Sequence, residues 1–337
     1  MPPPPDPSKS PGGAAIQARI EQALRELSIS QAHLAAVAPQ IAASLLLRGD
    51  SPPGLNSSLF DFRRKVVAVV EHFTGAGLTL PVYLRAALRQ PSLFYQSPAT
   101  IIGNVEGVAK HFKPHGLALP AYLRAIRRQP QLFYQSPTTI TSNIEGIVNH
   151  FAGHGLTLPA YLRAALRQPS LFYQAPATVI AKIEAVAEHF VPQGLALQDY
   201  LQAAVKHPSL FYQLPGTIIR HVNTLISMYQ EGLLTLPGDR AAPPDQPMKP
   251  LFRFLMKHPA RLTQADDNYA LRATYARRFP NRLGAIALLC RPRQQLEQEL
   301  ALSLGKACPP GKGKKLIIDT KESHLGRIES IDQETPS

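Results

Sequence analysis

The chain of 337 residues has only two cysteines, Cys290 and Cys308. Two cysteines cannot form a disulfide framework, and neither stands at metal-ligand spacing from a pair of histidines. We therefore expect two unpaired thiols in a reducing compartment and no metal site. The sequence also lacks a glycine-rich phosphate loop and a local nucleophile motif. Nothing in it indicates an enzyme, a cofactor or a small-molecule substrate.

Long apolar runs are missing as well. Residues 34–47 are apolar, but this stretch is too short to cross a bilayer. The first residues lack the charged start and apolar run of a secretory signal. These absences predict a cytoplasmic protein with no membrane partner, while organelle targeting and export as an effector stay open.

Acidic residues are too few to balance the basic ones. The 36 Lys and Arg residues face 23 Asp and Glu residues, which gives a net charge of +13. Residues 1–51 are balanced, whereas residues 52–236 carry 15 basic and 8 acidic side chains, and the rest carries 17 and 11. Such a basic surface suggests a polyanionic partner, although a high isoelectric point also favours plain solubility.

What the chain does contain is a repeat of 39 residues. The block Leu-Phe-Tyr-Gln recurs at 93–96, 132–135, 171–174 and 210–213. The clear units are 91–129, 130–168 and 169–207, with a degenerate unit at 52–90 and another that begins at Pro208. A repeat of this length is typical of stacked supersecondary units.

The repeat divides the chain into segments. Residues 52–236 form the predicted array, interrupted by a linker or insertion at 237–250. A helical cap is expected at 16–51, and a degenerate repeat with cap helices at 251–305, including a helix over 294–304. The Pro-rich residues 1–15 and the charged tail 306–337 are expected to be disordered because they have few apolar groups.

One unit reads as two helices and a buried turn. Ser97 and Pro98 indicate a helix start. The serine side chain can cap the helix, and the missing N–H of proline costs nothing there because the first N–H groups of a helix have no partner within it. A stripe with helical period follows at Ile101, Val105, Val108 and Phe112. Gly116 is the expected left-handed stop, as are Gly77, Gly155 and Gly194.

The second helix of the unit opens at Pro120 and must end at Gln129, because Pro130 disfavours helix in the residue before it. Leu132 and Phe133 then fill the gap between units. A single unit cannot bury its apolar face alone, so units must stack. The predicted fold is all-α, an α-solenoid of helical hairpins with capping helices at both ends.

The succession of Pro-x-Leu-Phe, a capped helix, Gly-Leu and a second helix that ends at the next proline resembles the mitochondrial transcription termination factor (mTERF) family. Residues 90–94 and 128–130 carry the likeness, which extends over roughly 52–280. The resemblance implies a superhelix that binds nucleic acid, mostly duplex DNA, through basic side chains. The 39-residue unit is longer and more regular than is usual in that family. An independent helical repeat family with similar punctuation is the alternative.

The candidate site is a pair of cations four residues apart on the second helix of each unit. Spacing of four puts both on one face, so stacked units would extend a basic ladder. With about 8 to 10 Å between stacked helices, five rungs would span roughly 40 to 50 Å. The alternative is a solvated helix face. The ladder residues are Arg85, Arg89, Arg124, Arg128, Arg163, Arg167, Lys206, Arg253 and Lys257.

Four further sets recur with the same period. Two tyrosine sets suggest either base stacking or core: Tyr83, Tyr122, Tyr161 and Tyr200, and then Tyr95, Tyr134, Tyr173 and Tyr212. His72, His111, His150 and His189 suit the C-terminal dipole of the first helix. Variable positions on the first helix, which we expect to be exposed, either select bases or reflect drift: Asn104, Asn143, Lys182 and His221.

These patterns predict a non-enzymatic helical-repeat protein that binds nucleic acid, DNA rather than RNA, through its basic ladder. The alternative is a protein–protein interaction scaffold, including a secreted effector.

Overall fold

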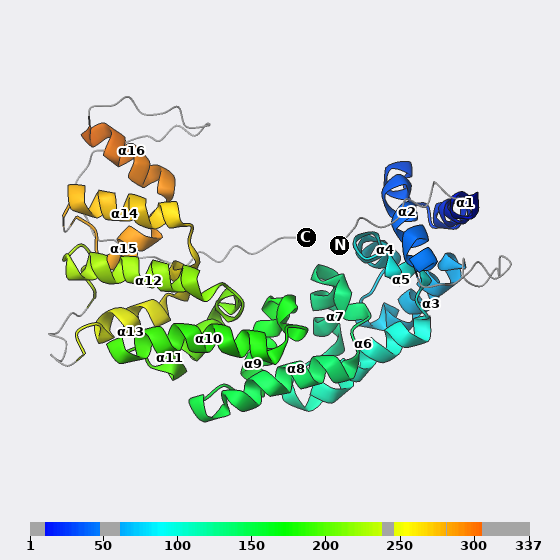
Figure 1. The fold of residues 1–337 in the computed structure, drawn as a ribbon, viewed down its shortest axis with the longest axis horizontal. Helices are drawn as coiled ribbons and strands as arrows, with labels where there is room; N and C mark the ends of the chain where they lie inside the picture. Colours follow the sequence, from blue (N-terminus) through cyan, green and yellow to red (C-terminus); the bar gives the residue numbers. More distant parts are fainter. Residues whose placement is uncertain (1–10, 48–60, 238–245, 281, 305–337) are drawn as a thin grey trace, which may run out of the picture. The chain divides into compact units, whose positions relative to one another are not determined.

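The computed structural model describes residues 11–47, 61–237, 246–280 and 282–304, and within these ranges the chain is helical throughout, with no strand (Figure 1). The prediction of an all-α protein is confirmed. The first ten residues, the predicted tail from 306 and most of the 237–250 insertion lie outside the described residues.

Two helices precede the repeats, α1 (Pro11–Arg25) and α2 (Gln31–Leu47), and they pack against each other. The predicted start of the cap at residue 16 is wrong, because the helix already begins at Pro11. Proline is well suited to a first helical position, where no N–H is needed. Ile20, Leu24 and Ile41 form the buried contact faces.

From residue 62 onward, a long helix alternates with a short one. Each long helix contacts the next long helix, and each short helix contacts the next short one (Figure 1). The long helices are α3 (Phe62–Phe73), α6 (Pro98–Phe112), α8 (Pro137–His150), α10 (Pro176–Phe190), α12 (Pro215–Gln230) and α14 (Asp266–Arg278). The short helices are α4 (Leu80–Arg89), α7 (Leu119–Arg128), α9 (Leu158–Arg167), α11 (Leu197–Lys206) and α13 (Lys249–Lys257).

The predicted helix boundaries are largely right. Between long and short helix the chain makes one 3₁₀ turn, as at Lys113–His115, and then a glycine with positive φ, +89° at Gly116 and +81° at Gly155. Only glycine adopts this conformation without strain. The predicted capping bond of Ser97 is absent: Ser97 precedes α6, but its side chain makes no capping hydrogen bond.

A short buried turn joins each short helix to the next long one. These turns are α5 (Ser92–Tyr95), η4 (Pro130–Phe133), η6 (Pro169–Phe172), η8 (Pro208–Phe211) and η9 (Pro259–Thr263). Leu132 and Phe133 of η4 are fully buried. The Tyr83 ring of α4 meets the Phe133 ring edge-on at 5.3 Å, and Tyr122 meets Phe172 in the same way at 5.2 Å. Each turn is thus packed against the short helix that precedes the one it follows: η4 follows α7 and packs against α4.

The first tyrosine set is core, as the apolar stripe indicates. Tyr83, Tyr122 and Tyr161 have no exposed surface, and the hydroxyls of Tyr83 and Tyr161 donate to the carbonyls of Leu93 and Leu171. Base stacking on this set is therefore excluded while the fold is intact.

Burial raises the pKa of the phenol groups of Tyr83, Tyr122, Tyr161 and Tyr200 far above the ordinary value of 10.0. The pKa of these phenols is thus higher in the folded chain than in the unfolded chain. The resulting contribution to stability is complete below the pKa of the unfolded chain and is lost as pH rises above about 10. We expect these four tyrosines to ionise only as helical circular dichroism is lost. Because the chain has eleven tyrosines, ionisation of more than seven of them near pH 10 in a fully helical protein would contradict this burial.

At the end of the chain, contacts divide the protein into two units, Met1–Cys290 and Arg291–Ser337, so the boundary lies inside the predicted 251–305 segment. In the first unit, Arg272 and Arg261 donate to the carbonyls of Leu288 and Leu289 and hold α15 (Ala285–Cys290). The second unit contains α16 (Arg293–Ser303), one residue from its predicted position. No described helix combines the length and the apolar character needed to span a membrane.

Candidate nucleic-acid interface

Every ladder residue is exposed in the structure. Two rows of arginines run through α4, α7 and α9, with one residue of each row on each helix. The first-row arginines are Arg85, Arg124 and Arg163, and the second-row arginines are Arg89, Arg128 and Arg167, the last residues of their helices. These three helices contain no Asp or Glu. The cations on them are therefore not neutralised by acids of their own helix.

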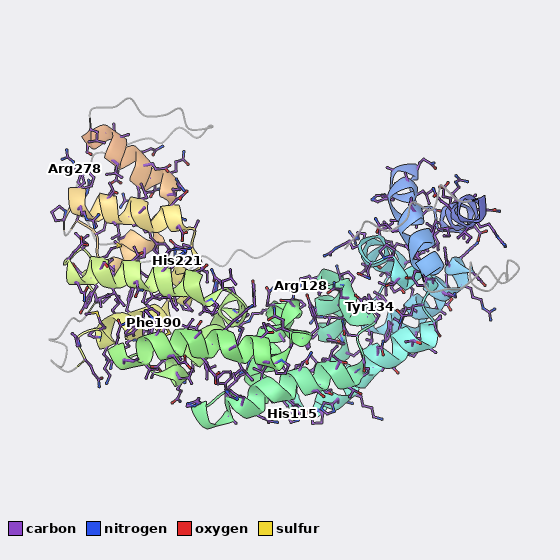
Figure 2. The ribbon with its side chains drawn as sticks, in the orientation of Figure 1. His115, Arg128, Tyr134, Phe190, His221 and Arg278 are labelled. Carbon is purple, nitrogen blue, oxygen red and sulfur yellow. The ribbon has the colours of Figure 1, made fainter. Side chains whose placement is uncertain are left out.

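The second-row arginines also hold neighbouring short helices together. Arg89 donates from Nη2 to the carbonyl of Arg128 at 3.1 Å, and Arg128 donates from Nη1 to the carbonyl of Arg167 at 3.0 Å. Arg167 donates to the carbonyl of Lys206 at 3.3 Å. Carbonyls in the last helical turn have no partner within their own helix. Each second-row arginine thus caps the C-terminus of the following short helix (Arg128 is labelled in Figure 2).

The first-row arginines have no such structural bond. Among the described residues, no hydrogen bond or ion pair joins Arg85, Arg124 or Arg163 to another side chain or carbonyl. Their guanidinium groups are exposed and available to an external anion. The ladder therefore contains one row with a role in the fold and one row without it.

Sequence reasoning missed the partners of the recurring histidines. His72 pairs with Glu106, His111 with Glu145 and so on, each Nε2–Oε1 distance being 2.7 Å. The third pair is His150 with Glu184, also at 2.7 Å. Within one unit the glutamate stands five residues before the histidine, a spacing that does not bring two side chains together on a helix. The histidine meets the glutamate of the next unit instead, 34 residues on. The shared 39-residue recurrence of both residue types was the available signal.

The variable positions of the long helices, which we expected to be exposed, are half-buried or buried. Asn104 and Lys182 are half-buried, and they donate to the carbonyls of Phe133 at 3.4 Å and Tyr212 at 2.8 Å. Asn143 is half-buried at the equivalent place. Lys65, 39 residues before Asn104, donates to the carbonyl of Tyr95 at 3.2 Å. This position ties a long helix to the following turn.

His221 occupies the same position in α12, and its predicted exposure is wrong, since it is only 2% exposed (Figure 2). Its Nδ1 contacts the carbonyl of Leu262 at 2.9 Å and its Nε2 contacts Asp266 at 2.5 Å. The hydrogen bond from His221, together with Arg220, lowers the pKa of the Asp266 carboxyl below its ordinary value. The pair joins α12 to the start of α14.

The second tyrosine set is half-buried, as Tyr95, Tyr134 and Tyr173 show. Gln129 donates to the Tyr173 hydroxyl at 3.1 Å. Burial raises the pKa of Tyr134 and Tyr173. The rings of this set are therefore only partly exposed.

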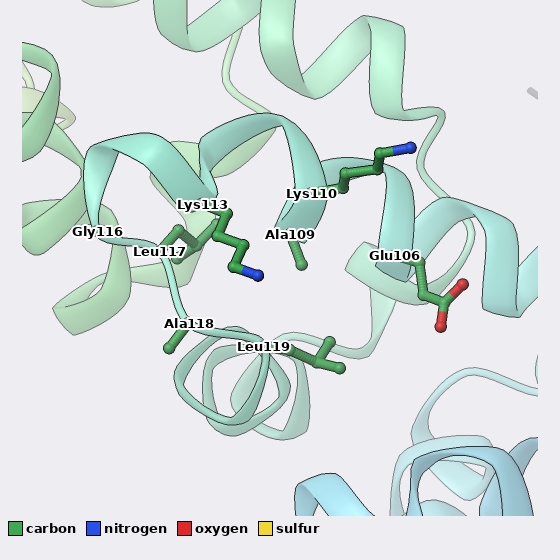
Figure 3. Close-up of a pocket in the computed structure, with 8 residues that line it drawn as sticks. All are labelled: Glu106, Ala109, Lys110, Lys113, Gly116, Leu117, Ala118 and Leu119. Atoms are coloured by element: carbon green, nitrogen blue, oxygen red, sulfur yellow. The ribbon is translucent and has the colours of Figure 1, made fainter.

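A separate apolar groove of about 550 Å³ lies between α6 and α7. Its apolar lining is Ala109, Leu117, Ala118 and Leu119. Figure 3 shows Lys113 reaching into the space between the end of α6 and the start of α7, while Lys110 extends away from it. Its charged lining residues are Lys110, Lys113 and Glu106, so the groove is an apolar surface bordered by both signs of charge.

No group of three or more His, Cys, Asp or Glu side chains among the described residues could hold a metal ion. No family model matches the chain, and no curated protein sequence matches it either. The resemblance to the mTERF family therefore rests on the motif residues 90–94 and 128–130 alone.

Proposed function

We propose that the protein is an α-solenoid of 39-residue helical hairpins that binds duplex DNA through the phosphate contacts of its basic ladder. The observation that carries this proposal is the separation of charge by helix: α4, α7 and α9 bear exposed arginines and no acid, while Glu106, Glu145 and Glu184 lie on long helices. A row of cations without internal acids is suited to a polyanion.

The geometry of the contacts also supports recognition of the backbone rather than of base sequence. Arginine matches phosphate with a planar, bidentate fork of donors. The positions that the repeat varies are engaged with neighbouring turns, as for Asn104, Lys182 and His221. Backbone contacts of this kind fix position on a duplex but carry no sequence information. The DNA complex we propose is therefore weakly sequence-dependent.

A salt titration tests this function. Affinity for labelled duplex DNA, single-stranded DNA and RNA is measured between low and physiological salt. We expect the duplex to bind most tightly, with log affinity falling by about 0.9 per log salt for each neutralised phosphate. Two duplexes of unrelated sequence should bind alike. Absence of binding to all three, or binding with no salt dependence, would reject the proposal.

A protein-interaction scaffold is the second candidate, and the apolar groove between α6 and α7 is the observation that favours it. Apolar clefts with a few polar neighbours are usual binding sites. If the titration shows no nucleic-acid binding, a substitution in this groove, Leu119→Lys, is the entry point for a search for protein partners.

A further inference from the structure

One residue breaks the repeat in the array of short helices. Arg127 stands where the other units have Leu88, Leu166, Val205 and Met256. Those four side chains are half-buried or buried, whereas Arg127 is exposed. Among these short helices, α7 alone has a third arginine in place of the apolar side chain found at this position of the repeat. Arg127 was not part of the predicted ladder.

The added arginine lines a groove between α4 and α7. The groove has a volume of about 510 Å³. It is lined by Val82, Arg85, Arg89, Arg124, Arg127 and Arg128, so five of its six lining residues are arginines. Its size falls within the usual range for small-ligand sites, about 300–1,000 Å³.

The guanidinium groups of this groove are partly positioned by the fold. Arg89 spans it, since its Nη2 donates to the carbonyl of Arg128 at 3.1 Å. Arg85, Arg124 and Arg127 have no ion pair with an acidic side chain anywhere in the described ranges. Like charges that lie close together at a protein surface repel one another. An anion in the groove would relieve this repulsion.

A second groove, two units further along the chain, can be compared with the α4–α7 groove. The groove between α9 and α11 is lined by Gly155, Leu156, Ala160, Leu201, Gln202, Val205 and Lys206, and its volume is about 170 Å³. Gln202 and Val205 stand there in place of Arg124 and Arg127. Two of the five groove arginines, Arg124 and Arg127, are therefore replaced by uncharged side chains in the α9–α11 groove, while Arg163 and Arg167 keep the positions of Arg85 and Arg89 in the repeat.

We infer that the α4–α7 groove is an anion site that holds two or three linked phosphate groups. The guanidinium groups of Arg85, Arg124 and Arg127 can bind phosphate oxygens in bidentate fashion. Arg89 and Arg128, which also donate to helix-terminal carbonyls, add positive charge beside them. The same chemistry occurs in free oligophosphates and in successive phosphates of a nucleic-acid strand. Within the proposed function, on which this role rests, the groove is the main anchoring point of the ladder.

The test is isothermal titration of the full-length chain with inorganic tripolyphosphate at constant ionic strength. We expect one site per chain. Arg127→Leu, which restores the residue found at Leu88 and Leu166, should keep the fold and weaken binding about 10-fold or more, as expected for lost charge-assisted hydrogen bonds. The double substitution Gln202→Arg with Val205→Arg should create a second site in the α9–α11 groove.

Tricarballylate, a tricarboxylate, controls for general attraction of anions and should bind far more weakly. No tripolyphosphate binding by the wild-type chain, or equal binding by Arg127→Leu, overturns the groove assignment, even if DNA still binds the ladder. Tripolyphosphate binding without any nucleic-acid binding supports the groove and rejects the DNA proposal. Competition between tripolyphosphate and duplex DNA for the wild-type chain supports both.

Discussion

Phe133→Ala is expected to lower the free energy of unfolding by about 3–5 kcal/mol, the usual cost of removing a buried phenylalanine side chain. Phe133 has no exposed surface, and its ring packs against Tyr83 of α4 at 5.3 Å. The substitution opens a cavity at this contact between different units. Urea denaturation followed by helical circular dichroism measures the loss.

The adjacent Tyr134 provides the control for this experiment. Tyr134 is half-buried, and Tyr134→Phe removes only its hydroxyl. We expect this change to alter the free energy of unfolding by no more than about 0.5 kcal/mol. A loss below about 1 kcal/mol for Phe133→Ala would show that the buried turn does not hold neighbouring units together.

The two rows of the ladder are expected to respond differently when replaced by glutamine. The first-row triple variant, Arg85→Gln with Arg124→Gln and Arg163→Gln, removes three exposed cations that have no partner in the described structure. We expect it to retain its stability. The slope of log DNA affinity against log salt should fall by about 2.7, which corresponds to three lost phosphate contacts.

The second-row triple variant is the matched comparison, with Arg89, Arg128 and Arg167 replaced by glutamine. It removes the same charge and also five hydrogen bonds to carbonyls in the last turns of short helices. Each such bond contributes about 0.5–1.5 kcal/mol, so the free energy of unfolding should fall by about 2.5–7.5 kcal/mol in total. DNA affinity should fall as well. Equal stability of the two variants would contradict the capping role, and unchanged DNA affinity of both would contradict the ladder.

The sequence was sufficient for the secondary structure of the units because local physics fixes it. Pro98 begins a helix, Gly116 takes a positive φ of +89°, and the stripe from Ile101 to Phe112 has helical period. Proline, glycine and a periodic apolar stripe determine the backbone conformation of only a few neighbouring residues in the sequence. The exposure of the ladder followed from the same reasoning, since cations four residues apart share the face opposite Tyr122 and Ile126.

What the sequence could not supply was the identity of partners in neighbouring units. The pairing of His111 with Glu145, the bond from Arg128 to the carbonyl of Arg167, and the burial of His221 all join different units. Each depends on the offset at which one unit packs on the next. A spacing of 34 or 39 residues has no meaning for contact until that offset is known.

The sequence by itself determined an all-helical chain with a 39-residue period and a row of cations on its short helices, because helix formation and facing depend on spacings within one unit. Only the tertiary structure decided which of those cations are available. It assigned the second-row arginines to helix capping, brought five arginines around the α4–α7 groove, and drew the variable positions into contact with the turns. The physical reason is that charge and hydrogen-bonding capacity belong to a side chain, whereas their use depends on which neighbours packing brings within reach.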